Sequence, residues 1–217
     1  MKTIYLVRHG ESEANISQNH GSPDSPLTER GHQQAKFIAE RASKLPVELL
    51  ISSDFTRARQ TAEHISKKIG LEPEISRLFG ESKGPSRFFN ASYEDQEAIT
   101  AFAQMRENYG KPGWRFEDGE NFEDHHTRAM AALQLLADKK EERILVVTHG
   151  MFLRILAAHV IFGAEITAHE CQRVVHSLET ENTGLTIFNY GSSFYDGRSR
   201  ENPWLLWVYN DHAHLAD

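Results

Sequence analysis

Residues 4–15 read I-Y-L-V-R-H-G-E-S-E-A-N. The first four are apolar or aromatic, and the run stops at a charged turn that contains Gly10, which is typical of a buried central strand in an α/β protein. Residues 143–150, R-I-L-V-V-T-H-G, repeat the same pattern. Each of these two predicted strands therefore leads into a histidine, His9 after the first and His149 after the second.

The rest of the chain alternates between helical and strand patterns. Apolar residues at helical spacing, with capping residues such as Thr28 and Asn121, predict helices over residues 28–45, 56–69, 93–108, 121–139, 151–162 and 165–178. Further strands are predicted over residues 49–51, 185–189 and 205–209. This alternation predicts an α/β three-layer sandwich, with a largely parallel central sheet flanked by helices.

The length of the chain bounds its domain organisation. A chain of 217 residues can bury one core, so we expect a single domain over residues 1–217. The periodic pattern weakens between about residues 80 and 119, where Gly, Pro and aromatic residues interrupt it. This stretch is predicted to be an insertion over the sheet, at about residues 80–119.

Composition excludes several classes of protein. The net charge of −7 argues against a general nucleic-acid binder, which would need a basic surface. The single cysteine, Cys171, cannot form an internal disulfide, which favours a cytoplasmic protein. No apolar run approaches the roughly 18 residues of a membrane span, so no membrane association is expected. Nothing in these features indicates an oligomeric state.

A third strand adds a cation to the two histidines. Residues 52–59, S-S-D-F-T-R-A-R, follow the predicted strand 49–51 and place Arg57 in the first turn of a helix, where anions are favoured. Arg59 lies about 200° further around that helix and is expected on the surface. Ligands of such sheets bind beyond the carboxyl ends of the strands. Arg8, Arg57 and the two histidines should therefore converge there, and buried cations need an anionic partner such as a phosphoryl group.

Taken together, these segments resemble the histidine phosphatase superfamily, in its phosphoglycerate mutase-like branch 1. The resemblance rests on R-H-G-E-S-E-A-N at 8–15, S-P-L-T-E-R-G-H-Q-Q-A at 25–35, the Arg57 segment, G-E-N-F-E-D at 119–124 and T-H-G at 148–150. It implies that His9 becomes phosphorylated. A neutral imidazole suits this role if its other nitrogen is held by a backbone hydrogen bond.

The resemblance also implies the groups that bind the phosphoryl oxygens. Arg8, Arg57 and a protonated His149 would stabilise the charge that develops on these oxygens. Asn15 resembles a further phosphate-binding amide of the family, although a loop cap explains it as well. Contacts with substrate are also expected from His20, Gly21 and Gly150.

An alkoxide leaving group needs a proton, which the family supplies from an acidic residue in the insertion. Residues 77–84, R-L-F-G-E-S-K-G, resemble that segment and make Glu81 the candidate, although Gly80 separates it further from the preceding leucine than is usual. Neither a cofactor nor a metal is expected. The neighbouring His125 and His126 would point about 100° apart on a helix and could not share an ion without distortion.

The expected activity is hydrolysis of a small phosphate ester. The insertion is shorter than that of the phosphoglycerate mutases, and their lysine- and tyrosine-bearing segment is not recognisable, which favours a phosphatase. A mutase-type phosphotransferase is the alternative, and a catalytically inactive binding module is a weaker one. A sugar phosphate, a nucleotide and a phosphoprotein all stay open as substrates, because the insertion offers a varied wall: Arg87, Phe88, Phe89, Tyr93, Arg106, Trp114 and Arg115.

Overall fold

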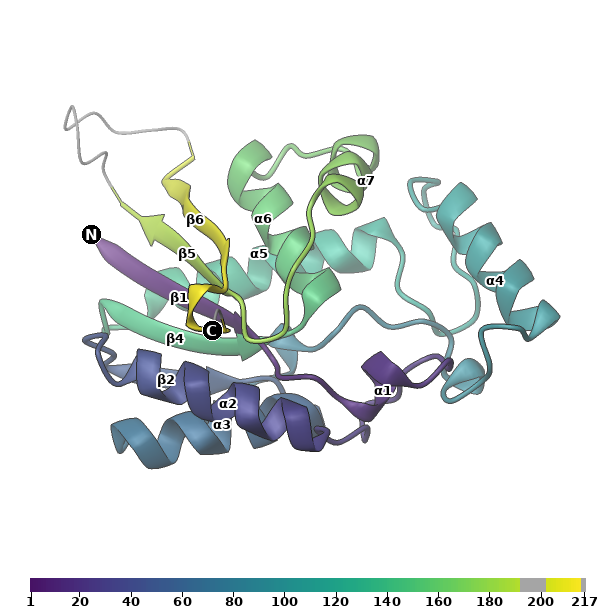
Figure 1. Ribbon diagram of the computed structural model, residues 1–217. Helices are drawn as coiled ribbons and strands as arrows, with labels where there is room; N and C mark the ends of the chain where they lie inside the picture. Colours follow the sequence, from purple (N-terminus) through teal and green to yellow (C-terminus); the bar gives the residue numbers. More distant parts are fainter. Residues whose placement is uncertain (192–201, 216–217) are drawn as a thin grey trace.

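The computed structural model describes residues 1–191 and 202–215. They form a central sheet with helices on either side of it (Figure 1). The sheet has six strands in the order β3-β2-β4-β1-β5-β6. The strands are β1 (Lys2–Arg8), β2 (Leu49–Ser52), β3 (Glu74–Ile75), β4 (Arg143–Thr148), β5 (Leu185–Tyr190) and β6 (Trp204–Asp211). The pairs among β1, β2, β3 and β4 are parallel, whereas β5 runs antiparallel to both β1 and β6. The predicted, largely parallel sheet is confirmed.

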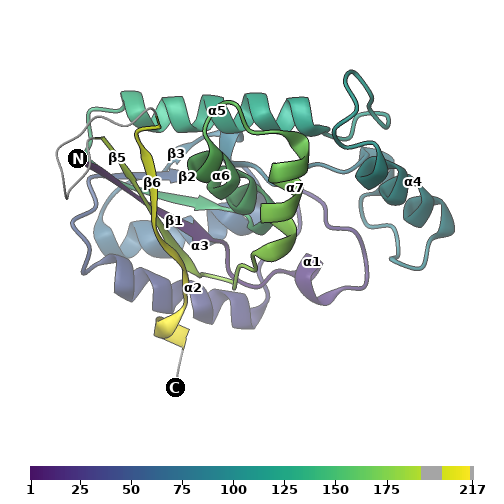
Figure 2. The ribbon, with the colours of Figure 1, turned by 90° about the horizontal axis from the view of Figure 1, so that it is seen from above.

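Helices cover both faces of this sheet (Figure 2). On one face lie α2 (Glu29–Ala42) and α3 (Thr56–Ile69); on the other lie α5 (Phe122–Asp138) and α6 (Gly150–Phe162), with α7 (Ala168–Ser177) against α6. In both views, α1 (Glu13–Ile16) and α4 (Gln96–Glu107) lie beyond the carboxyl ends of β1 and β4. Short 3-10 turns occur at Arg77–Phe79, Ser86–Phe88 and Ala213–Leu215.

The continuous apolar run of β1 follows from its burial on both faces. Ile4 and Leu6 belong to the core on the side of α5 and α6, whereas Tyr5 and Val7 belong to the core on the side of α2 and α3. Successive side chains of a strand point to opposite faces, so a strand covered on both sides needs apolar residues at every position. β4 is buried in the same way.

The helices differ from the sequence predictions mainly at their ends. α4 begins only at Gln96, because Asp95 caps it by accepting from two backbone N–H groups, and α7 begins after a capping box formed by Thr167 and Glu170. The short α1 and β3 were not predicted, since two to four residues leave no periodic signal. None of the helices within residues 1–191 and 202–215 has the length and apolar character needed to cross a membrane. The single-domain organisation stays a prediction.

Helix α2 touches the turn after β1 at its first residues. A Cβ atom on Gly31 would lie 1.9 Å from the carbonyl oxygen of Glu11, and one on Gly10 would lie 2.5 Å from the carbonyl oxygen of Gly31. Real Cβ atoms do not approach other atoms so closely, so both positions require glycine. Two glycines thus press the start of α2 against the turn that carries His9.

Replacing Gly31 by alanine is therefore expected to lower the free energy of unfolding by about 3 kcal/mol, as in other overpacked sites. In an open helix the same change would instead stabilise by about 1 kcal/mol. Chemical denaturation of both proteins measures the difference. Lys36→Ala, at an exposed position of α2, serves as the control and should change stability little. A Gly31→Ala protein as stable as the wild type would contradict the close approach.

Candidate active site

Three neighbouring parallel strands bring the predicted residues together. β2, β4 and β1 lie side by side, and Arg8 pairs in register with Thr148. The next residues, His9 and His149, therefore leave the sheet at the same level, and their ring centroids are 5.0 Å apart. Arg57 reaches them from the first turn of α3, which follows β2. The convergence expected from the sequence is observed.

His9 is a neutral, oriented imidazole. It is 2% exposed, and its Nδ1 lies 2.7 Å from the carbonyl oxygen of Gly10, an acceptor, so Nδ1 carries the hydrogen. Nε2 then carries no hydrogen, and its lone pair accepts from Nε of Arg57 at 3.1 Å. Burial, together with the charges of Arg57 and Arg8, lowers the pKa of His9 well below its usual value. This is the tautomer that a nucleophilic Nε2 requires.

Two arginines flank His9. Arg57 is 6% exposed and also donates from Nη1 to the carbonyl oxygen of Ser22 at 2.9 Å. Arg8 donates from Nη1 to the carbonyl oxygen of Thr180, while its buried Nε has no partner among the described residues. Burial lowers the pKa of both guanidinium groups, yet arginine stays charged at neutral pH. The turn after β1 thus has two positively charged guanidinium groups, those of Arg8 and Arg57, close to His9.

His149 is held by a serine from the neighbouring strand end. Its Nε2 lies 2.8 Å from Oγ of Ser53, which also accepts from the N–H of Phe55. Its Nδ1 finds no partner in residues 1–191 and 202–215, and it carries the hydrogen in the tautomer in which the Ser53 hydroxyl donates to Nε2. Burial, with His9 and Arg57 adding to it, lowers the pKa of His149 well below its usual value. Without a bound anion the neutral form of His149 is thus favoured, and the protonated His149 expected beside a phosphoryl group stays a prediction.

The carboxylate of Glu81 sits on the N-terminus of α6. It accepts from the backbone N–H groups of Ser82 at 2.8 Å, Phe152 at 3.0 Å and Met151 at 3.3 Å. The free N–H groups of a first helical turn favour a carboxylate at this place. Because α6 begins directly after His149, this contact brings Glu81 to the edge of the histidine pair.

Seven of the nine predicted site residues line a cavity of about 240 Å³. Its wall includes Arg8, His9, Asn15, His20, Gly21, Arg57 and Glu81. Oδ1 of Asn15 accepts from the N–H of Ser12, the N-cap of α1, at 3.0 Å, so Asn15 both completes the capping box of this helix and lines the cavity. His149 and Gly150 are not part of this wall. A Cβ on Gly150 would lie 3.3 Å from Nε of Arg8, so Gly150 makes room for that side chain, and its contact with substrate stays a prediction.

A second cavity of about 470 Å³ adjoins the first. Both are lined by His20, Glu81, Ser82, Gly84, Tyr93 and Phe102. Of the wall candidates in the insertion, Phe88, Phe89 and Tyr93 line the first cavity, and Tyr93 and Arg106 line the second. Trp114 lines neither; Arg87 forms ion pairs with Glu97 and Glu117, and Arg115 forms one with Asp124.

Several supporting residues were missed from the sequence. Thr61 on α3 accepts from the N–H of Gly10 at 3.1 Å, and Gln34 on α2 accepts from the N–H of Glu11 at 2.8 Å. Both side chains are buried polar groups on otherwise apolar helix faces, which is the signal that could have found them. Ser53, whose hydroxyl holds His149, left no comparable signal.

The adjacent histidines diverge as expected. His125 contacts Ser82 and Tyr109, whereas His126 contacts His159. Across the described ranges, no group of three or more His, Cys, Asp or Glu side chains is arranged to hold a metal ion.

Comparison with known proteins gives one family. The model of the histidine phosphatase superfamily (branch 1) matches residues 4–199. The probable phosphoglycerate mutase GpmB of Escherichia coli O139:H28 is 34% identical, over 99% of this chain and 95% of that protein. The protein of the same name from Photorhabdus laumondii is 31% identical, over 96% of this chain and 91% of that protein.

Solved structures of lower identity share the fold. Phosphoserine phosphatase from Entamoeba histolytica, in complex with 3-phosphoglyceric acid, has a TM-score of 0.76 at 22% identity and covers 99% of this chain and 100% of that one. Mycobacterial glucosyl-3-phosphoglycerate phosphatase, in complex with VO3, has a TM-score of 0.75 at 22% identity, with coverages of 97% and 100%. At this identity the likeness establishes the fold, and activity has to be argued from the site.

Proposed function

Because the chain belongs to branch 1 of the histidine phosphatase superfamily, we propose that it hydrolyses small phosphate monoesters through a phosphohistidine formed on His9. One observation carries this proposal. The neutral, buried imidazole of His9 lies beside the charged Arg57 and the ring of His149, and two buried nitrogens of the same cluster, Nε of Arg8 and Nδ1 of His149, have no partner in the described chain. Buried donors are costly when unsatisfied, and an anionic phosphoryl group would satisfy them.

In the first step, Nε2 of His9 would attack phosphorus while the bond from phosphorus to the leaving oxygen breaks. The N–H of Arg57 that donates to Nε2 in the free protein would donate to a phosphoryl oxygen instead, which leaves the lone pair of Nε2 available for the attack. Nδ1 would keep donating to the carbonyl oxygen of Gly10, so the ring stays oriented while it carries the positive charge of the phosphohistidine.

The equatorial oxygens of the phosphoryl group would be bound by Arg8, Arg57 and Asn15, with Nδ1 of His149 as a further donor. A phosphoryl dianion beside His149 would raise the pKa of that ring, because a nearby opposite charge favours the protonated form. His149 would thus become protonated together with substrate binding.

Glu81 would act as acid and then as base. Its carboxyl group would give a proton to the leaving oxygen in the first step. In the second step, water would attack the phosphorus of the phosphohistidine, the bond from phosphorus to Nε2 would break, and Glu81 would take back a proton from that water. The products are an alcohol and inorganic phosphate, and the enzyme returns to its starting state.

A phosphoglycerate mutase is the second candidate function, supported by the names of the two GpmB relatives. A mutase must hold the carboxylate of a glycerate while it exchanges phosphoryl positions. Two arginines of the insertion, Arg87 and Arg115, are already paired with carboxylates, which leaves Arg106, in the wall of the larger cavity, as the insertion's arginine placed for this task. We favour hydrolysis, because this chain lacks a recognisable counterpart of the lysine- and tyrosine-bearing substrate segment of the mutases.

The larger cavity would hold the leaving group. It begins at Glu81 and is lined by apolar side chains such as Met105, Ile155 and Val175, with Arg106 and Gln172 among its polar groups. We propose that the chain acts in the cytoplasm as one domain, in which residues 80–119 form the cover of the site.

Assays of the purified protein can separate the two candidates. We expect inorganic phosphate to be released from p-nitrophenyl phosphate and from several phosphorylated metabolites without any added activator. With 3-phosphoglycerate, interconversion to 2-phosphoglycerate should stay slower than phosphate release, whether or not 2,3-bisphosphoglycerate is present. Interconversion that outpaces release in the presence of the bisphosphate would establish a mutase instead.

A further inference from the structure

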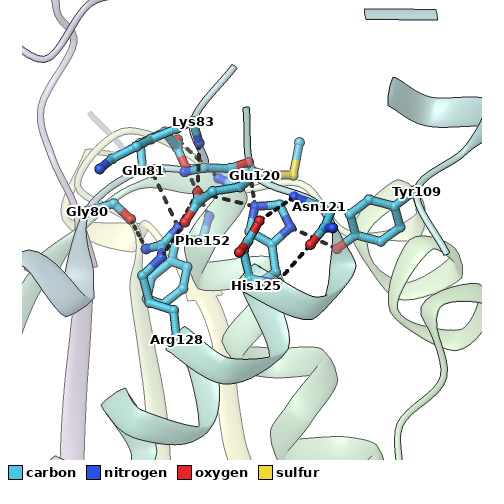
Figure 3. A network of polar contacts seen from close by, with 12 residues as sticks. Gly80, Glu81, Lys83, Tyr109, Glu120, Asn121, His125, Arg128 and Phe152 are labelled. Carbon is cyan, nitrogen blue, oxygen red and sulfur yellow. Dashed lines mark hydrogen bonds and ion pairs between the residues drawn. The ribbon is translucent and has the colours of Figure 1, made fainter. Parts of the chain in front are cut away.

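Arg128, on α5, binds the turn that carries Glu81 (Figure 3). Its Nη1 donates to the carbonyl oxygen of Gly80 at 2.7 Å and to that of Leu78 at 3.3 Å. Its Nη2 reaches the carbonyl oxygen of Glu81 itself at 3.4 Å. One guanidinium group thus holds the backbone at and before the residue proposed as proton donor.

The same guanidinium forms a two-pronged ion pair with Glu120. Its Nε and Nη2 lie 2.8 Å and 2.7 Å from the two carboxylate oxygens, and Oε2 of Glu120 also accepts from the N–H of Lys83 at 2.8 Å. Burial raises the pKa of Glu120, but a hydrogen bond from His125 and the charge of Arg128 outweigh it and bring this pKa to about 2. The pair therefore stays charged at neutral pH. It binds the backbone on both sides of Glu81, through Arg128 at Gly80 and through Glu120 at Lys83.

Arg128 also packs against the residue that anchors the Glu81 carboxylate. Its Cζ lies 3.9 Å from the ring centroid of Phe152, and the N–H of Phe152 donates to Oε1 of Glu81 at 3.0 Å. Arg128 lines neither cavity. It contacts the backbone of Glu81 and the anchor of its side chain, but has no place in the wall that would meet substrate.

We propose that Arg128 is a positioning residue, which, paired with Glu120, fixes the Glu81 carboxylate at the junction of the two cavities. This inference rests on the proposed role of Glu81 as proton donor. The need for such a clamp follows from the local chain. Residues 80–85 have no regular secondary structure and contain Gly80 and Gly84, so contacts with other segments, the ion pair among them, have to fix the path of this turn.

A leaving-group series tests the proposal. p-Nitrophenolate leaves readily without a proton, whereas an alkoxide needs one. Because kcat/KM reports only the first step, before water attacks the phosphohistidine, a displaced Glu81 should lower kcat/KM mainly for alkyl phosphates. For Arg128→Met we expect kcat/KM to fall on the order of 100-fold with 2-glycerol phosphate, but less than about 10-fold with p-nitrophenyl phosphate. Arg128→Lys, which keeps the charge but not the fork, should be intermediate. Glu120 also lines the larger cavity, so the shape-conserving Glu120→Gln is used there, and it should show the same selectivity as Arg128→Met.

A double-mutant cycle separates positioning from general destabilisation. In a Glu81→Gln background, Arg128→Met should cause no further selective loss with 2-glycerol phosphate. Arg41→Met, which breaks an ion pair with Asp211 away from both cavities, is the matched control and should affect both substrates equally. Thermal unfolding of each variant identifies any that does not fold.

The outcomes are distinct. Equal losses with both substrates in the folded Arg128 and Glu120 variants, or additive losses in the Glu81→Gln background, would overturn the positioning role. If Glu81→Gln alone showed no leaving-group selectivity, Glu81 would not be the proton donor and the inference would fall with it. Phosphate release by the wild type would still leave the hydrolase function standing.

Discussion

Replacing His9 by alanine is expected to lower kcat/KM for p-nitrophenyl phosphate on the order of 10⁴-fold or more, because the nucleophile itself is removed. The cationic surroundings would remain and could still bind phosphate, so inorganic phosphate should inhibit binding of a fluorescent substrate analogue to both proteins. Phosphate release from p-nitrophenyl phosphate, followed by absorbance, measures the loss.

A half-buried histidine away from the cavities provides the control for this substitution. His32 on α2 contacts His64 and lines neither cavity, so His32→Ala should retain activity close to that of the wild type. Acid-labile phosphate, trapped by rapid quench of the wild type, should be located on His9 by mass spectrometry. Equal rates for His9→Ala and the wild type, or a label on another residue, would refute a His9 nucleophile.

Arg57→Met should have the next largest effect, a fall of about 10²- to 10³-fold in kcat/KM, which is the usual cost of losing a donor to a developing anion. The pH profile should change as well. Burial first, and then the charge of Arg57, lowers the pKa of His9, so removing Arg57 raises this pKa. His9 attacks only when neutral, and activity on the acidic side should therefore disappear at a higher pH in the variant than in the wild type.

Arg59→Met is a closely matched control, because Arg59 lies on the same helix two residues away but is exposed. It should change neither the rate nor the acidic limb of the profile. An Arg57→Met enzyme with an unshifted acidic limb would show that the limb reports a group other than His9.

The sequence was most informative where the strands carry chemistry. The apolar runs before His9 and His149 predicted buried central strands, and β1 and β4 are neighbours in the middle of the sheet. The family expected from the motifs is confirmed by the match over residues 4–199. The helix that carries Arg57 was predicted over residues 56–69, and α3 has these bounds. Arg59 is exposed, as expected. These predictions succeed because strand burial and helix caps are local properties of the chain.

Contacts between distant segments were beyond the sequence. The anchorage of Glu81 on α6 joins residues about 70 positions apart, and Arg128 and Glu120 are eight residues apart, a spacing at which two side chains of one helix do not normally pair. The lowered pKa of His149 depends on burial by several elements at once, which no motif encodes. Such features follow from tertiary packing, so they can be found only once the fold is known.

Because the two cavities are distinct and share only part of their walls, substitutions in one of them can change the substrate while the other keeps the residues of the reaction. The groups proposed to handle phosphorus stand on the sheet and its adjoining helix ends, whereas much of the larger cavity is formed by α4 and the side chains of α6 and α7. Directed evolution restricted to positions such as Met105, Arg106 and Gln172 should therefore retune which alcohol is released without rebuilding the phosphoryl-transfer apparatus. Glu81, which borders both compartments, is the position that such a library has to leave untouched.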